Sequence, residues 1–326
     1  MHLVRLGKTN LRVSSIALGT GALGSRIDDH TSIRILDCFA GEGGVLIDTA
    51  NVYGRWNPGN EPLSELLIGR WMRFHHLRDR FVLATKGAAD DQRAIGVRRL
   101  SPTSIRSDLE NSLQNLQTDH IDLYYLHQDD PAKPVGEIVE TMNQLKGEGK
   151  IRYFGCSNWS RERITAADRY ADEHGLESFC ANEVMFNLAV PNRETVEAAT
   201  QRSVDDGLYR YHQETRMPLV SYTSQAAGYF ALYRRPDFMT AAKYAFSRDF
   251  FHNDRTLKHA ERVELLCALR GYTPLQVTLG YLNAQSFQVI PIVGPWNEDE
   301  FMASIEASDA VLTREELSFV LDGEAL

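Results

Sequence analysis

Four side chains capable of proton transfer follow three successive apolar runs of the chain. Asp48 and Tyr53 stand in "LIDTANVYG", and Lys86 stands in "FVLATKG". His127 comes directly after "IDLYYL". Carboxylate, phenol, ammonium and imidazole are the groups of general acid–base chemistry. Because each follows an apolar run, we expect the fold to bring them together at one site.

The tyrosine is the natural proton donor of this set. A phenol has an ordinary pKa near 10, which is too high for easy proton release at neutral pH. An ammonium about 4 Å away would stabilise the phenolate by on the order of 4 kcal/mol, or roughly three pKa units at most. We therefore expect Lys86 to lower the pKa of Tyr53 and Asp48 to hold Lys86 charged. His127 would hydrogen-bond the oxygen that becomes protonated, so the set would protonate an oxygen that acquires negative charge.

Apolar runs of this kind recur along the whole chain and alternate with helical patterns. Nearly continuous apolar runs are typical of parallel strands that are buried on both faces. Amphipathic spacing predicts helices such as residues 101–117, with Pro102 at the start. The expected strands lie at 15–19, 45–49, 81–85, 121–126, 151–155, 178–182, 218–222 and 289–294.

These repeats predict an α/β fold, a (β/α)8 TIM barrel, whose catalytic groups gather at the carboxyl ends of its strands. Residues 2–15 predict a β-hairpin that plugs the bottom of the barrel. The interval after the seventh strand is long and carries an aromatic loop at 229–255, which we expect to form a lid or a substrate wall. No linker or composition break divides residues 1–326, which predicts a single domain.

Composition argues against several other classes of protein. A net charge of −9 disfavours nucleic acid as a partner. The 4 cysteines are widely spaced, which fits reduced thiols better than a disulfide framework or a zinc site. The chain starts without an apolar signal segment, and no run approaches the length of a membrane span. We therefore expect a cytoplasmic protein without nucleic-acid, membrane or metal partners.

A glycine motif, "GTGALG", offers a different interpretation. Gly19, Gly21 and Gly24 have the G-x-G-x-x-G spacing of a Rossmann dinucleotide site. That site requires a helix that starts at the glycines and an acidic residue about 20 positions later. Here "SRIDDHT" intervenes before any helical pattern, and the acid that ends the second strand, Asp48, comes too late. We interpret the motif as the loop after the first barrel strand.

The chain resembles the aldo-keto reductase superfamily, in particular its bacterial members. "LIDTANVYG", "FVLATKG", "HIDLYYLHQDD" and "GKIRYFGCSNW" carry the resemblance, which is weaker over residues 190–290. It implies that NAD(P)H binds across the barrel mouth and that a hydride passes reversibly to the carbonyl carbon of an aldehyde, ketone or sugar. It also implies that Tyr53 protonates the oxygen. The implied catalytic residues are Asp48, Tyr53, Lys86 and His127.

The resemblance implies binding residues as well. Tyr222 would stack on the nicotinamide ring, and the loop of Gly19 would lie beside the nicotinamide ribose. The implied cofactor-binding residues are Gly19, Thr20, Gly21, Asp48, Ser157, Asn158, Glu183, Tyr222, Thr223, Ser224, Gln225, Gly294, Trp296 and Glu300. The expected substrate-binding residues are Tyr53, Trp56, His127, Gln128 and Trp159.

Two departures from the family pattern affect the expected cofactor site. Glu183 replaces the usual glutamine, and a carboxylate cannot donate to the oxygen of the nicotinamide carboxamide. Trp296 stands where NADPH-using members carry an arginine for the 2′-phosphate, and Glu300 replaces a glutamine. Loss of the guanidinium removes the best phosphate clamp. The cofactor is NADP or NAD, and we predict a weakened NADPH preference with NADH at least competitive.

Two other functions stay open at this stage. A barrel that binds the cofactor for regulation or redox sensing, as in the potassium-channel β-subunits of the superfamily, would show little turnover. The intact set of four proton-transfer residues favours catalysis instead. A metal-dependent hydrolase has less support, because "HQDD" (127–130) lacks an accompanying H-x-H or Cys/His set.

Overall fold

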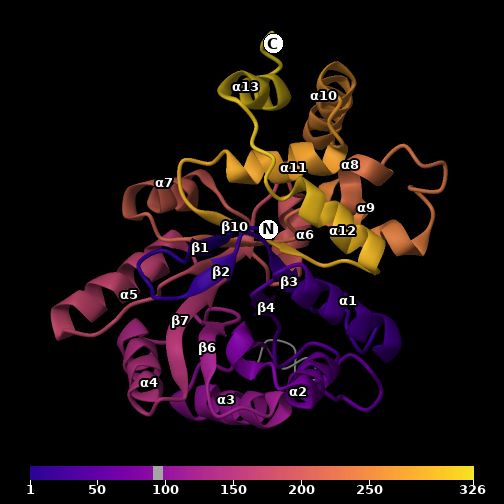
Figure 1. The fold of residues 1–326 in the computed structure, drawn as a ribbon. Helices are drawn as coiled ribbons and strands as arrows, with labels where there is room; N and C mark the ends of the chain where they lie inside the picture. The colour runs from indigo at the N-terminus through magenta and orange to yellow at the C-terminus, as the bar shows by residue number, and fades with distance from the viewer. Residues whose placement is uncertain (91–97) are drawn as a thin grey trace.

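Short, apolar, parallel strands form the wall of a closed barrel (Figure 1). The computed structural model describes residues 1–90 and 98–326. Within them the strand order around the barrel is β10-β3-β4-β5-β6-β7-β8-β9, and every neighbouring pair is parallel. The predicted TIM barrel is therefore confirmed. Its strands are β3 (Ala17–Gly19), β4 (Leu46–Asp48), β5 (Val82–Gly87), β6 (Ile121–Leu126), β7 (Ile151–Ser157), β8 (Asn182–Met185), β9 (Leu219–Tyr222) and β10 (Val289–Val293).

Helices connect the strands and cover the outside of the barrel. Their starts follow local capping chemistry: Ser101 caps α3, which has Pro102 in its first turn, and Asp28 caps α1. The helices along the barrel wall are α1 (Asp29–Gly41), α2 (Leu63–His75), α3 (Pro102–Leu116), α4 (Val135–Gly147), α5 (Arg161–His174), α6 (Arg193–Ala198), α7 (Asp206–Thr215), α11 (Pro274–Asn283) and α12 (Glu298–Ala307). None of the helices in residues 1–90 and 98–326 has both the length and the apolar character to cross a bilayer.

The sixth barrel strand differs most from the expected position. The sequence predicts residues 178–182, whereas β8 spans Asn182–Met185. The ladder starts at Asn182, which pairs with Cys156 on one side and Leu219 on the other. Phe179 is buried because its ring packs edge-on against Trp159. Residues 179–181 are apolar because they pack in the core, and this apolar pattern resembles that of a buried strand although these residues precede the ladder.

The predicted hairpin is present and closes one end of the barrel. β1 (Leu3–Arg5) and β2 (Arg12–Ser14) pair antiparallel, and the side chains of Leu6 and Leu11 are buried with those of the barrel interior. Ser14 Oγ accepts hydrogen bonds from the backbone N–H groups of Val45 and Leu46, at the start of β4. These contacts lie at the amino ends of the strands. The carboxyl ends, where barrels place their sites, remain open.

The segment between β9 and β10 is mostly helical. It contains η2 (Ala226–Gly228), α8 (Tyr229–Leu232), η3 (Ala242–Tyr244), α9 (Ala245–Phe251) and α10 (Asp254–Arg270), and α13 (Arg314–Asp322) packs on α10. Tyr229, Phe238 and Phe251 are buried in a cluster of their own beside the barrel. Figure 1 shows these orange and yellow helices gathered on one side of the molecule. The aromatic residues of the expected loop therefore form a second core, and Phe246 is the member that reaches the barrel mouth.

Candidate active site

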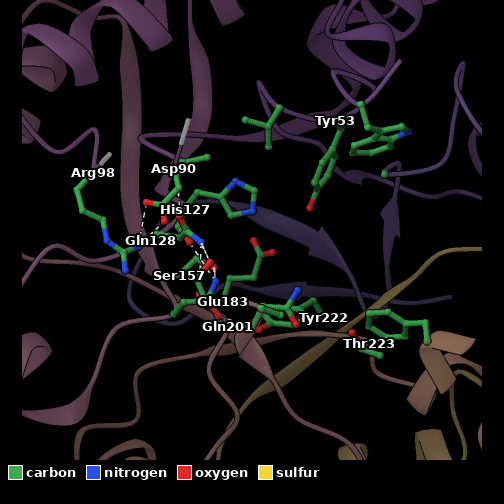
Figure 2. Close-up of a pocket in the computed structure, with 18 of the residues that line it drawn as sticks. Tyr53, Asp90, Arg98, His127, Gln128, Ser157, Glu183, Gln201, Tyr222 and Thr223 are labelled. Atoms are coloured by element: carbon green, nitrogen blue, oxygen red, sulfur yellow. Dashed lines mark hydrogen bonds and ion pairs between the residues drawn. The ribbon is translucent and has the colours of Figure 1, made fainter. Parts of the chain in front are cut away.

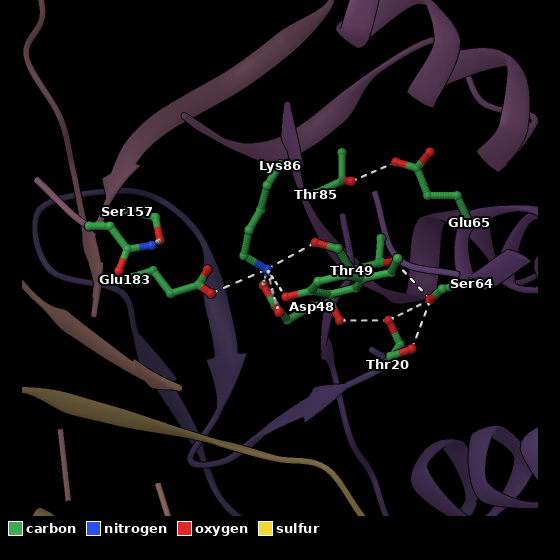
Figure 3. Close-up of polar contacts among 11 residues, drawn as sticks. Thr20, Asp48, Thr49, Ser64, Glu65, Thr85, Lys86, Ser157 and Glu183 are labelled. Carbon is green, nitrogen blue, oxygen red and sulfur yellow. Dashed lines mark hydrogen bonds and ion pairs between the residues drawn. The ribbon is translucent and has the colours of Figure 1, made fainter. Parts of the chain in front are cut away.

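A buried lysine lies at the carboxyl ends of the strands (Figure 3). Lys86 belongs to β5 and has no exposed surface. Its Nζ donates to Asp48 Oδ1 at 2.6 Å, to Asp48 Oδ2 at 2.8 Å and to the backbone carbonyl of Thr49 at 3.0 Å. The strand register brings these groups together, because Asp48 pairs with Ala84, which shares the inner face of β5 with Lys86. The predicted Asp48–Lys86 pairing is present in the structure.

A second carboxyl group and the phenol contact the same ammonium. Glu183 Oε1, from β8, lies 3.2 Å from Lys86 Nζ, and Glu183 is 2% exposed. Tyr53, in the turn after β4, places its hydroxyl 3.4 Å from Lys86 Nζ. The sequence led us to expect Glu183 at the cofactor only, so its ion pair with Lys86 is new information from the structure.

Burial and the two carboxyl groups decide the protonation of the lysine and the tyrosine. Burial lowers the pKa of Lys86, but the carboxyl groups, Asp48 more than Glu183, outweigh it, and the net pKa is raised. Burial raises the pKa of Tyr53 above its ordinary value; Lys86 opposes this, whereas Asp48 and Glu183 add to it. The expectation of a lowered tyrosine pKa is therefore wrong in direction, because burial, with a smaller contribution from the carboxyl groups, outweighs the field of the ammonium. Lys86 is an ammonium, and Tyr53 is a neutral phenol with a proton to give.

His127 lies beside the phenol and carries no charge. Its ring centroid is 5.9 Å from that of Tyr53, with an interplanar angle of 80°. Burial lowers the pKa of His127 to about 3, and the charge of Lys86 acts in the same direction. Its Nδ1 is buried and has no hydrogen-bond partner in the described part of the chain. A neutral imidazole can donate one hydrogen bond and accept another, which suits it to orient an oxygen.

These groups border a cavity of about 710 Å³ at the barrel mouth. Figure 2 shows the side chains of Tyr53, His127 and Glu183 pointing toward the same space. Asp48 and Lys86 are not among its lining residues and lie beneath it. Two expected substrate contacts, Trp56 and Gln128, do line the cavity.

Trp159 departs from the prediction that it lines the substrate pocket. Its side chain is 0% exposed and lies in the core between the barrel and α5. The ring packs against Phe179, and the guanidinium of Arg163 lies 5.2 Å from its centroid. Arg163 in turn pairs with Asp129 of "HQDD" at 2.9 Å. Trp159 and Asp129 are therefore parts of one structural packing unit outside the cavity.

The expected cofactor residues fall into three groups, of which the first lines the cavity. Asn158 in this group is held by its neighbours: its Nδ2 donates to the His127 carbonyl, and its Oδ1 accepts from Tyr222 Oη at 2.7 Å and from the Arg202 N–H at 2.9 Å. These bonds fix the ring of Tyr222 as one wall. The cavity-lining group comprises Gly21, Ser157, Asn158, Glu183, Tyr222 and Thr223.

The second group is buried below or beside the cavity. Thr20 donates to the Asp48 carbonyl at 2.8 Å, and Ser224 donates to the Ile292 carbonyl at 2.6 Å. Gln225 is partly buried and donates to Ser304 at 3.0 Å. Gly19 ends β3, and a Cβ there would lie 2.6 Å from Ile292 Cγ2. Gly19 therefore permits close packing of β3 on β10, and α1 starts only at Asp29, so the glycine motif does not form a Rossmann turn.

The third group lies on the rim after β10 and is exposed. Trp296 is 53% exposed, and Gly294 and Glu300 are also exposed. Glu300 accepts a hydrogen bond from the Trp296 backbone N–H at 2.9 Å, which folds the rim onto the first turn of α12. The predicted adenosine end of the site thus lies outside the cavity.

Several cavity residues escaped sequence reasoning because they belong to loops without a periodic pattern. Asp90 and Arg98 form an ion pair at 2.8 Å, and Gln128 accepts from the Asp90 N–H at 2.8 Å. Gln201, in the connection after α6, has a buried Oε1 without a partner among the described residues. The spacing of these residues in the sequence did not indicate a site, because only tertiary contacts bring them to the barrel mouth. The residues missed are Arg26, Val52, Ala89, Asp90, Arg98, Ala199, Thr200 and Gln201, whereas Phe246 belongs to the segment at 229–255 expected to form a substrate wall.

The comparisons with known proteins agree with this geometry. The family model described as "Aldo/keto reductase family" matches residues 15–320. The chain belongs to the aldo/keto reductase family. It is 30% identical to the uncharacterized oxidoreductase YrpG of Bacillus subtilis over 99% of this chain and 95% of that protein.

Two fungal relatives also match nearly the whole chain. Norsolorinic acid reductase B of Aspergillus parasiticus is 28% identical over 95% of this chain and 81% of its own length. Aryl-alcohol dehydrogenase GME11368 of Pestalotiopsis microspora is 27% identical over 99% of this chain and 82% of its own length. Family membership and these names support oxidoreductase chemistry on carbonyl groups in general.

The neutral state of His127 predicts a specific dependence of stability on pH. The folded pKa is about 3, below the ordinary value of 6.5, so the unfolded chain takes up a proton first as the pH falls. The resulting stabilisation is complete above pH 6.5 and decreases toward pH 3. Relative to His127→Gln, the parent should lose about 2 kcal/mol of unfolding free energy between pH 7 and pH 5, measured by denaturant titration. The exposed His30→Gln variant is the control, and equal losses in parent and His127→Gln would contradict a neutral His127.

Proposed function

We propose that this protein catalyses the NAD(P)H-dependent reduction of an aldehyde, ketone or sugar carbonyl and the reverse oxidation of the alcohol. One observation carries the proposal: the neutral phenol of Tyr53 lies 3.4 Å from a buried ammonium and faces a cavity that it shares with a neutral imidazole. A carbonyl reduction needs this combination, since the oxygen must receive a proton as it gains negative charge.

Each residue of the set has a defined part in the proposed reaction. The dinucleotide supplies the hydride when bound. Tyr53 donates its proton to the carbonyl oxygen, and the Lys86 ammonium stabilises the phenolate that forms. Asp48 holds Lys86 in place through both carboxylate oxygens. His127 is neutral and orients the carbonyl oxygen by a hydrogen bond.

The cavity residues fit a nicotinamide ring and its carboxamide. Glu183 Oε2 and Gln201 Oε1 are buried polar atoms without a partner in the described chain, and the amide group of a carboxamide would satisfy them. The ring of Tyr222 offers an aromatic face for stacking, and Ser157 a hydroxyl group. Gly21 leaves the cavity free of a side chain beside the ring of Tyr53, which would lie 3.8 Å from a Cβ at this position. Thr223, Ser224 and Gln225 would continue the site toward the exposed rim at Gly294, Trp296 and Glu300.

Aromatic side chains around the mouth favour a planar, partly apolar substrate. Trp56 is 42% exposed and Phe246 is 43% exposed, and both line the cavity. The guanidinium of Arg26 lies 5.2 Å from the ring centroid of Trp56. One relative is named as an aryl-alcohol dehydrogenase. We infer that aryl aldehydes or ketones are the first substrates to try.

The rim after β10 favours NADH as much as NADPH. Glu298, Asp299 and Glu300 occupy the first turn of α12, where a helix would otherwise attract a phosphate. Arg34 pairs with Glu298, so its charge is already compensated. Trp296 offers an apolar surface to an adenine but no charge to a 2′-phosphate. We therefore infer that the 2′-phosphate gains no dedicated ion pair here.

Substitution of Tyr53 by Phe tests the proposed reaction. Turnover of an aryl aldehyde, followed by nicotinamide absorbance, should fall at least about 100-fold because the proton donor is lost. The dissociation constant of the reduced cofactor should change by less than about threefold, since the ring stays in place. Tyr170→Phe, in α5 and outside the cavity, is the matched control.

Two results would contradict the proposal. A Tyr53→Phe variant with more than about a tenth of the parent turnover would remove Tyr53 from its proposed role. A parent protein that binds the cofactor but reduces nothing in a panel of aldehydes, ketones and sugars would favour the regulatory or redox-sensing function.

Substitution of Trp296 by Arg tests the proposed cofactor preference. The parent should bind NADH and NADPH with dissociation constants within about tenfold of each other. The variant should gain about tenfold in NADPH affinity relative to NADH, because one charge-assisted hydrogen bond is worth about 1.5–3 kcal/mol. Trp296→Leu removes the ring without adding charge and should show no such gain. A parent that selects NADPH by more than about 100-fold would contradict the inference.

A further inference from the structure

The second carboxyl group at the lysine is the feature that the proposed reaction does not use. We propose that Glu183 stores a proton and returns it through Lys86 to Tyr53 after each reduction. The inference rests on the proposed function, because it concerns the proton that Tyr53 gives to the substrate. It assigns Glu183 a part in proton supply, beyond contact with the cofactor.

The three groups form a continuous path for a proton. Glu183 Oε1 lies 3.2 Å from Lys86 Nζ, and Lys86 Nζ lies 3.4 Å from Tyr53 Oη. Figure 3 shows Glu183 approaching Lys86 from the side opposite Glu65 and Thr85. The ammonium therefore lies within hydrogen-bonding distance of both the carboxyl group and the phenol.

Burial raises the pKa of both carboxyl groups, and the closer contacts of Asp48 with Lys86 favour a proton on Glu183 rather than on Asp48. Asp48 has the two shorter contacts with Lys86, at 2.6 and 2.8 Å, so it is the carboxylate that balances the ammonium. Burial raises the pKa of Glu183 well above its ordinary range, and the neighbouring charge of Asp48 raises it further. A buried pair of carboxyl groups beside one cation holds a single shared proton more readily than two negative charges.

Among the described residues, Glu183 is held by its neighbours through one oxygen only. Its Oε2 is buried and has no partner in the described chain, and the residue lines the cavity. Glu65 provides the contrast within the same barrel. Burial raises the pKa of Glu65 as well, but its oxygens accept from Thr85 at 2.7 Å and from Asn115 at 2.9 Å. Glu65 is therefore a structural carboxyl group, and Glu183 is available for exchange.

The proton transfers balance as follows. The Oη–H bond of Tyr53 breaks as an O–H bond forms on the substrate oxygen. A proton of the Lys86 ammonium then moves to the phenolate, and the carboxyl proton of Glu183 moves to Lys86 Nζ. Glu183 ends as a carboxylate and takes up one proton from bulk solvent, which is the proton that the overall reduction consumes. No electrons move in these steps, because the hydride transfer of the proposed function is complete.

The other titratable groups that face Glu183 do not supply this proton. They are Asp48 from β4, Tyr125 from β6 and Tyr222 from β9, in addition to Lys86 and Tyr53. Burial raises the pKa of Tyr125 well above its ordinary value. Burial also raises the pKa of Tyr222. Both phenols stay neutral over the working range, which leaves Glu183 as the group that ionises when the pH rises.

The test compares Glu183→Gln with Glu65→Gln. Reduction by the parent should decline as rising pH ionises Glu183 and removes the stored proton. In Glu183→Gln that ionisation is absent, so the pH at which the reduction rate starts to decline should be higher by at least about one unit. The maximal rate should fall about tenfold because the store is lost. Glu65→Gln should keep the parent pH profile.

Infrared spectroscopy of the protein without substrate supplies a second readout. The C=O stretch of a protonated carboxyl group should disappear in Glu183→Gln at pH 7, and Glu65→Gln should leave that band in place. A band unchanged in Glu183→Gln, or parent turnover with an identical Glu183→Gln pH profile, would overturn the inference alone. A parent without turnover on any carbonyl would overturn the proposed function and this inference together.

Discussion

The site depends on one buried ammonium and the groups that compensate its charge. Lys86 has no exposed surface, so its charge is tolerable only because Asp48, the Thr49 carbonyl and Glu183 surround it. The same contacts fix its distance to Tyr53. Removal of a compensating group would therefore disturb the protonation of the phenol as well as the stability of the barrel. The protonation of Tyr53 and the stability of the barrel therefore both depend on the contacts of Lys86.

The order of the strands in the barrel brings Lys86 and its carboxyl groups together, because these residues do not belong to one local sequence motif. Asp48 and Lys86 come from the adjacent strands β4 and β5, whereas Glu183 comes from β8 across the barrel. The N-terminal hairpin closes the amino ends of the strands and leaves their carboxyl ends open. The aromatic cluster after β9 supports one side of the mouth. These parts leave the barrel open at the end that carries Tyr53 and His127.

Sequence reasoning succeeded where a residue's position follows from its place at a strand end. It predicted the barrel, the hairpin and the gathering of Asp48, Tyr53, Lys86 and His127. It could not place Trp159 or the Glu183–Lys86 contact, because both depend on packing between segments far apart in the chain. The direction of the Tyr53 pKa was wrong for a related reason: burial and a second carboxyl group enter only in three dimensions. Whether the named residues bind cofactor and substrate stays a prediction.

The most direct test of the buried ammonium is the unfolding free energy of Lys86→Met at pH 7. Removing one partner of a buried ion pair costs about 3–5 kcal/mol, since the remaining carboxylate has no compensating charge. We expect that loss in Lys86→Met and a partial recovery when Asp48→Asn is added. An unfolding free energy within about 1 kcal/mol of the parent would contradict a site organised around Lys86.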